Sequence, residues 1–263
     1  MNLTINYKTL PKDSKLIYIK NDYIFILQNN KLFTLTLANK ILPSSKIDFF
    51  IKSIYLLKNE YLFVQSQTNW FYKKLNEISF TKLEYKKIFF SDDKMFILKN
   101  TKLFYYKVSV KKEIFVCELF FFFKDLFCLK GKLFFLTNSS EKEDCSKIYS
   151  CNWNDKKVKL EEYLSNIGIN SFINNDYCLL VCKTNKNIII DDLKNNINVF
   201  NTPSQSKVLL TDKLILYFTD KVIIHDRLTN QILKKLNLKV NFTYFYKDTL
   251  FLLSEILYLI KFN

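Results

Sequence analysis

Four short apolar segments near the start of the chain decide its fold: LIYI (16–19), YIFILQ (23–28), KLFTLTL (31–37) and KIL (40–42). They are rich in Ile, Leu, Phe and Tyr, and polar breaks such as KND and NN separate them. Short apolar runs bounded by Asn and Asp are typical of β-strands joined by tight turns. The stretch therefore predicts one four-stranded antiparallel sheet.

The same arrangement recurs along the chain, which indicates a repeat architecture. The first segments of the successive groups begin at Leu16, Ser53, Lys87, Asp125, Ile169, Lys207 and Asn241. The fourth segments of the second and fourth groups are expected at ISF (78–80) and KVKLEEY (157–163). No segment holds a helical period over three turns, so we expect almost no helix.

The two ends of the chain complete each other. The last group has only three segments, ending with ILYLIKF (256–262), and the strand-like segment NLTINY (2–7) has no partner in the first group. Ring closure by an outer N-terminal strand leaves a propeller without an open seam. The sequence therefore predicts one all-β domain over residues 1–263, a seven-bladed β-propeller in which residues 2–7 complete the last blade.

The residue counts exclude several kinds of active site. The chain has two glycines, Gly131 and Gly168, and one histidine, His225. Gly-rich phosphate loops and sites built on two or three histidines cannot be made from this set. No GxSxG nucleophile elbow is present either. We expect no enzyme activity, no cofactor, no metal and no small-molecule substrate.

The N-terminal sequence lacks the apolar core of a signal peptide. The most apolar stretch, residues 114–136, is broken by charges so often that its longest uncharged run is five residues. A bilayer span needs roughly 20 apolar residues, so no transmembrane segment is expected. The six cysteines are interpreted as reduced, buried side chains of an intracellular protein.

One pair of hairpins gives the clearest internal alignment: IIHDRLTNQIL (223–233) over IIIDDLKNNIN (188–198). The pattern resembles the WD40 repeat, whose third strand ends in Trp-Asp. His225-Asp226 stands at that position here, and Asp191 is its equivalent in the fifth group. The resemblance implies a propeller fold and a scaffolding role, with Asp191, His225 and Asp226 as structural turn residues. No Gly-His pair precedes the first strands, so the usual buried hydrogen-bond network of that family is not expected.

The formal net charge of +15 has two interpretations. Lysine almost replaces arginine in this chain, which fits A/T-rich codon usage and a solvated surface without a function. Alternatively, lysine pairs form a face that contacts phosphates of RNA, at the turns between third and fourth strands. The candidate residues are Lys73, Lys74, Lys111, Lys112, Lys156 and Lys157. An acidic insertion with Glu141, Glu143 and Asp144 is expected on the opposite face.

These observations favour a non-catalytic scaffold or docking subunit of a large intracellular assembly. The expected partners are other protein subunits and, through the basic face, RNA, as in the ribosome or its assembly in the cytoplasm, nucleus or nucleolus. The alternatives are a coat or nuclear-pore scaffold, a propeller that binds phosphoinositides or a membrane surface, and an enzyme. Nearly all aromatic side chains are assigned to the core.

Overall fold

The structure of the chain is a computed structural model. It describes residues 3–8, 15–38, 40–91, 93–129, 131–137, 145–155, 158–168, 172–174, 179–183, 187–191, 197–201, 207–210, 214–218, 220–226, 229, 231–240, 242–246, 249–253 and 257–262. Within these residues the regular structure is β-strand, apart from one short 3-10 helix at Val108–Val110. The prediction of an all-β chain with almost no helix is confirmed for this part of the sequence.

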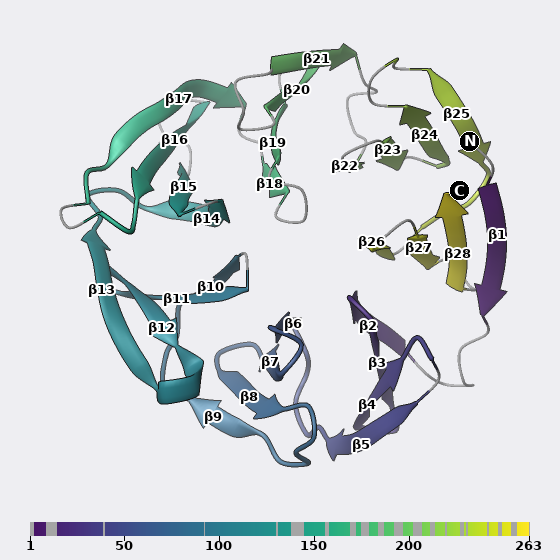
Figure 1. The fold of residues 1–263 in the computed structure, drawn as a ribbon, viewed down its shortest axis with the longest axis horizontal. Coiled ribbons are helices and arrows are strands. Elements are labelled where there is room, and N and C mark those ends of the chain that lie inside the picture. The colour runs from purple at the N-terminus through teal and green to yellow at the C-terminus, as the bar shows by residue number, and fades with distance from the viewer. Residues whose placement is uncertain are drawn as a thin grey trace. The chain divides into compact units, whose positions relative to one another are not determined.

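Within the described residues the strands form seven four-stranded antiparallel sheets, in which neighbouring strands are consecutive in the chain apart from one pair that joins its two ends (Figure 1). The chain divides into two compact units, Met1–Lys86 with Leu238–Asn263, and Lys87–Asn237. We call these unit 1 and unit 2. Unit 1 holds three of the sheets and unit 2 holds four.

Unit 1 contains the sheet that joins the two chain ends, with the order β1-β28-β27-β26. Strand β1 pairs with β28 from Leu3 opposite Phe262 to Lys8 opposite Leu257. The strands of this unit are β1 (Leu3–Lys8), β2 (Lys15–Lys20), β3 (Tyr23–Gln28), β4 (Lys31–Thr36), β5 (Ile41–Lys46), β6 (Ser53–Leu57), β7 (Tyr61–Gln65), β8 (Trp70–Lys74), β9 (Thr81–Leu83), β26 (Phe242–Tyr246), β27 (Thr249–Leu253) and β28 (Leu257–Phe262).

Unit 2 consists of four sheets made from strands that are consecutive in sequence. Its strands are β10 (Ile88–Ser91), β11 (Lys94–Lys99), β12 (Lys102–Lys107), β13 (Lys112–Glu118), β14 (Phe123–Leu129), β15 (Lys132–Thr137), β16 (Cys145–Asn152), β17 (Glu161–Gly168), β18 (Phe172–Asn174), β19 (Leu179–Lys183), β20 (Asn187–Asp191), β21 (Ile197–Asn201), β22 (Lys207–Leu210), β23 (Leu214–Phe218), β24 (Val222–Asp226) and β25 (Ile232–Leu236).

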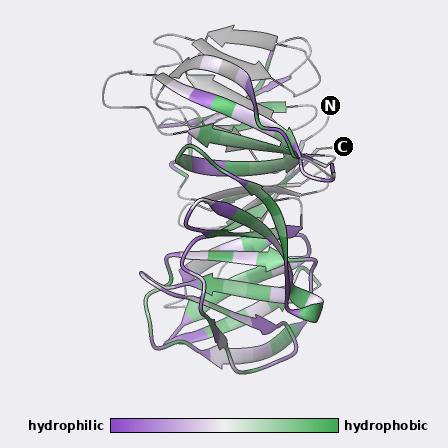
Figure 2. Ribbon diagram, turned by 90° about the vertical axis from the view of Figure 1, so that its left-hand side faces the viewer, coloured by the Kyte–Doolittle hydropathy of each residue, from purple (hydrophilic) through white to green (hydrophobic). Residues whose placement is uncertain are grey.

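Burial explains why the second strand of a sheet is apolar along its whole length. Every residue of β23 is buried, as are four of the five residues of β7, whereas β25 at the outer edge has no buried residue. Strands covered on both faces need apolar side chains on both. Figure 2 shows hydrophobic colour concentrated in strands and hydrophilic colour in many of the turns.

Asparagine supplies the left-handed backbone that the tight turns require. Asn21, Asn29, Asn30 and Asn100 have φ angles of 54°, 49°, 58° and 55°. Among L-residues, Asn adopts this conformation most readily, because its short polar side chain can hydrogen-bond locally. A chain with two glycines can therefore still close its hairpins.

Two outer strands lie later in the sequence than predicted. The fourth strand of the second group is β9, not residues 78–80, because buried Leu83 pairs with Trp70 while Ile78 remains 65% exposed. The fourth strand of the fourth group is β17, not residues 157–163. Val158 and Leu160 pack against the core but precede the strand. Their apolar character therefore reflects contact with the core and not hydrogen-bond pairing with β16.

Candidate interaction surfaces

Lys73 is not the exposed phosphate contact that the sequence predicted. Only 2% of the residue is exposed, and its Nζ donates to the carbonyl oxygen of Glu77 at 2.7 Å. The ring of Phe80 lies 5.7 Å from the same nitrogen. Burial lowers the pKa of Lys73, and the Glu77 carboxylate opposes that shift. The exposure expected at this position is therefore wrong, because the side chain is buried within unit 1.

The neighbouring Lys74 does lie at the surface, where its Nζ is 3.8 Å from a carboxylate oxygen of Glu60. In unit 2, Lys111 and Lys112 are both exposed: Lys111 caps the C-terminal end of the 3-10 helix with a φ of 51°, and Lys112 is the first residue of β13. Lys156, Lys157 and the acidic residues Glu141, Glu143 and Asp144 lie outside the described residues. Whether these lysines contact phosphates stays a prediction.

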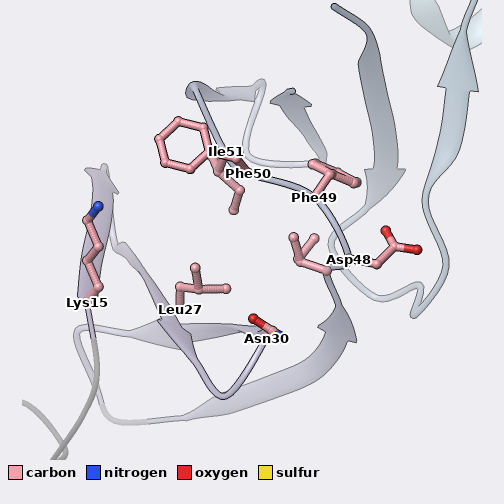
Figure 3. Close-up of a pocket in the computed structure, with 8 residues that line it drawn as sticks. Lys15, Leu27, Asn30, Asp48, Phe49, Phe50 and Ile51 are labelled. Carbon is pink, nitrogen blue, oxygen red and sulfur yellow. The ribbon is translucent and has the colours of Figure 1, made fainter. Parts of the chain in front are cut away.

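Two surface grooves have the same position in their respective sheets. The first groove, of about 310 Å³, lies in unit 1 where β5 passes to β6 (Figure 3). The second groove, of about 410 Å³, lies in unit 2 where β13 passes to β14. The first is lined by Lys15, Leu27, Asn30 and the run Ile47–Ile51, and the second by Lys87, Phe89, Leu98, Asn100, Thr101 and the run Leu119–Lys124.

The connector between β13 and β14, residues 119–122, lines the second groove and is fixed in place by its buried and half-buried side chains. Leu119 is 3% exposed, and its N–H donates to the carbonyl oxygen of Thr101 at 2.8 Å. The half-buried Phe121 ring stacks on Tyr149 with centroids 4.3 Å apart, and Phe123 packs against Phe89 at 4.7 Å. These contacts form a fixed aromatic floor for the groove.

The remaining two side chains of the connector face water. Phe120 is 71% exposed and Phe122 is 78% exposed. Among the described residues that line the groove, two are lysines, Lys87 and Lys124, and none carries a carboxylate. Partial burial lowers the pKa of Lys124, and the adjacent Asp125 carboxylate opposes the shift. The arrangement can bind an apolar group next to an anion.

The first groove differs at its mouth. Figure 3 shows Lys15, Leu27 and Phe50 around the open space, with the Asp48 carboxylate pointing away from it. Phe50 is 66% exposed. This groove therefore presents one exposed phenylalanine where the second presents two.

The fold has counterparts among solved structures, whereas no family model and no curated protein sequence matches the chain. The WD40 domain of Neurospora crassa Pan2 is similar over 92% of this chain and 86% of that one, with a TM-score of 0.60 and 10% identity. Kluyveromyces lactis Hsv2 is similar over 89% of this chain and 87% of that one, with a TM-score of 0.54 and 11% identity. The N-terminal domain of Nup159 is similar over 98% of this chain and 95% of that one, with a TM-score of 0.53 and 9% identity.

The chain has a WD40-like β-propeller fold. At these identities the similarity concerns the fold alone. The resemblance to WD40 repeats that was inferred from the His225-Asp226 and Asp191 hairpins is confirmed for the fold. The described part of this WD40-like propeller contains no helix long and apolar enough to cross a membrane.

The predicted turn residues of the WD40-like propeller lie at the ends of third strands. The Asp226 carboxylate accepts from the N–H of Thr229 at 2.8 Å and from its hydroxyl at 3.0 Å, which are contacts of a turn-anchoring acceptor. His225 is half-buried, and its ring packs edge-on against Tyr217 at 4.9 Å. Burial raises the pKa of Tyr217 to about 12. Asp191 ends β20, where its backbone pairs with Leu180 and Ile197.

Three of the cysteines, Cys117, Cys128 and Cys151, are buried in one core cluster of unit 2 and form no disulfide. Their burial agrees with the interpretation as small core side chains. A hydrogen bond with Cys117 and burial both raise the pKa of Cys151, which keeps that thiol protonated. In the described residues, no group of three or more His, Cys, Asp or Glu side chains has a geometry that could hold a metal ion.

Sequence reasoning missed the exposed phenylalanines of the WD40-like propeller. It assigned almost all aromatics to the core, yet Phe50, Phe120 and Phe122 are mostly exposed. A signal was present, because residues 120–124 fall between a segment expected to end at 119 and one expected to begin at 125. Apolar residues in a connector cannot be explained by strand burial.

Proposed function

We propose that this chain is a non-catalytic propeller scaffold that docks other protein subunits inside the cell. The observation that carries the proposal is the pair of exposed side chains Phe120 and Phe122 beside a fixed aromatic floor. Exposed apolar clusters rimmed by polar groups are typical of protein interaction sites. Phe50 at the equivalent connector of unit 1 adds a second, smaller surface of the same kind.

Affinity purification of the tagged full chain tests this function. Contacts made by buried phenylalanines depend little on ionic strength, whereas contacts to phosphates weaken steeply with salt. We expect protein partners to remain bound after nuclease treatment and a high-salt wash. Loss of all partners on nuclease treatment would contradict protein docking and favour RNA.

An RNA-containing assembly, such as the ribosome or its assembly intermediates, is the second candidate. The net charge of +15 and the exposure of Lys74, Lys111 and Lys112 favour it. Replacing these three together with Lys156 and Lys157 by Glu should abolish association with ribosome-sized particles. Neutralising Glu141, Glu143 and Asp144 should leave it unchanged. Lys73 is left intact, because its burial would confuse loss of binding with loss of folding.

We propose further that the sheets close into one seven-bladed ring over residues 1–263. The pairing of β1 with β28 supports this, since it unites both chain ends in one sheet. Deleting residues 1–10 would leave the edge of β28 unpaired, and we expect a lower Tm for the whole domain or loss of soluble protein. A deletion variant that melts like the intact chain would contradict ring closure.

A further inference from the structure

We propose that the second groove binds a short linear segment of a partner protein, in which an aromatic or large aliphatic side chain is flanked by Asp or Glu. The inference deepens the proposed docking function, on which it rests, by naming the kind of partner. It is carried by four features of the groove: its floor, its mouth, its charge and its size.

The floor is built before any ligand arrives. Phe121 is held by stacking on Tyr149, and its ring also meets Phe135 edge-on at 5.9 Å. Phe123 contacts Phe89 and also meets Phe135 at 5.3 Å. Rings fixed by neighbours on several sides lose little freedom when a ligand covers them, which favours binding.

The mouth offers apolar surface that the fold itself does not use. Phe120 meets Phe121 and Tyr149 edge-on at 5.0 and 5.6 Å, and most of its surface faces water, as does that of Phe122. Covering two such rings removes a large apolar area from water, and aromatic residues at a pocket are the usual hot spots of an interface.

The charge of the lining selects the ligand. Lys87 and Lys124 line the groove, and no carboxylate belongs to the lining residues that the structure describes, although Asp125 follows Lys124 directly in the chain. An incoming carboxylate would form charge-assisted contacts with the ammonium groups of these two lysines. The chain's net charge of +15 would also attract acidic segments from a distance.

The size favours a segment over a folded surface. A volume of about 410 Å³ accommodates one or two side chains with their backbone. The first groove supplies a matched comparison, because it has the same place in its sheet but its described lining residues include one lysine, Lys15, and one carboxylate residue, Asp48. We therefore expect acidic segments to prefer the second groove.

The test selects peptides from a random library displayed on phage, with the folded full chain as bait. Enriched peptides are then synthesised with a fluorophore, and their Kd is measured by fluorescence polarisation. We expect an aromatic or large aliphatic anchor flanked by Asp or Glu. The double variant Phe120→Ser with Phe122→Ser should weaken binding about tenfold or more, and Lys87→Glu about threefold or more. The control variants Phe50→Ser and Lys15→Glu should stay within about twofold of the parent.

Three results would overturn the inference. They are enriched peptides without acidic flanks, peptides that bind the Phe120/Phe122 double variant as tightly as the parent, and no enrichment at all. The affinity purification from lysate distinguishes failure of this inference from failure of the proposed docking function. If the double variant keeps its salt-resistant protein partners, the chain docks through another surface and only this inference falls. If the parent has no such partners yet binds the peptides through Phe120 and Phe122, the inference stands and the proposed function falls.

Discussion

The connectors β5–β6 in unit 1 and β13–β14 in unit 2 share one framework and differ at their surface. Ile47 and Leu119 are buried to 2% and 3% exposure, and their N–H groups donate to Asn30 and Thr101 at 2.7 and 2.8 Å. Two residues later, a half-buried phenylalanine stacks on the third strand of the next sheet. The centroid distances are 4.5 Å for Phe49 with Phe71 and 4.3 Å for Phe121 with Tyr149.

The difference lies at the two positions that contribute least to this framework. Asp48 and Phe50 are exposed in unit 1, whereas Phe120 and Phe122 are exposed in unit 2. Equal burial at the other positions indicates that packing determines them. The exposed pair makes few packing contacts, so its chemistry differs between the two connectors while their framework stays the same.

The third strands extend the comparison. Lys73 pairs with buried Leu62 in unit 1, and Cys151 pairs with buried Leu133 in unit 2. Both side chains are buried, although one is an amine and the other a thiol. A lysine can occupy this position because its nitrogen reaches the Glu77 carbonyl oxygen at 2.7 Å.

The largest expected effect comes from reversing that charge. Lys73→Glu would bury a carboxylate facing a carbonyl oxygen, with no donor in place of the lost ammonium. We expect the free energy of unfolding to fall by about 3–5 kcal/mol, measured by urea denaturation. The adjacent, exposed Lys74→Glu should cost less than about 1 kcal/mol. Similar costs for both variants would show that position 73 is not buried as its Cys151 counterpart is.

A smaller effect is expected from the shared anchor of the connectors. Ile47→Ala and Leu119→Ala each remove buried methyl groups and leave a cavity, so each should lower the free energy of unfolding by about 3 kcal/mol. The two costs should agree within about 1 kcal/mol, because burial and hydrogen bonding agree at the two sites. A cost confined to one unit would break the comparison between the connectors.

Sequence patterns predicted the inner strands closely because burial on both faces leaves an uninterrupted apolar signal. Residues 23–28 were expected as a strand and form β3 with those bounds, and the expected strand at 31–37 forms β4 over Lys31–Thr36. Outer strands carry a weaker signal, since one face meets water. That is why the shift from Ile78 to Leu83 was missed, and why an exposed position was assumed for Lys73. To tell a buried lysine from an exposed one in an outer hairpin, the direction of its side chain must be known. The alternation of apolar and polar residues along a strand does not give that direction.

The stacked phenylalanines should show a still smaller effect. Phe49→Ala and Phe121→Ala each remove a half-buried ring together with its stacking contact, and we expect a loss of about 2 kcal/mol from thermal or urea denaturation. Phe→Leu substitutions at the same positions retain most of the apolar area and should recover about half of that loss. If Leu recovered all of it, stacking would contribute nothing and packing volume alone would hold the connectors.

The smallest stability effect, and the sharpest surface effect, is expected from exchanging the exposed residues. Asp48→Phe and Phe120→Asp alter side chains that face water, so each should change the free energy of unfolding by less than about 0.5 kcal/mol. Binding of a hydrophobic fluorescent dye should rise in Asp48→Phe and fall in Phe120→Asp, because the exposed apolar area of the two connectors changes in opposite directions. Thr101→Ser, at the rim of the second groove, serves as the control and should alter neither quantity. A large loss of stability in Phe120→Asp would mean that this ring belongs to the framework, and the division between framework and surface positions would have to be drawn elsewhere.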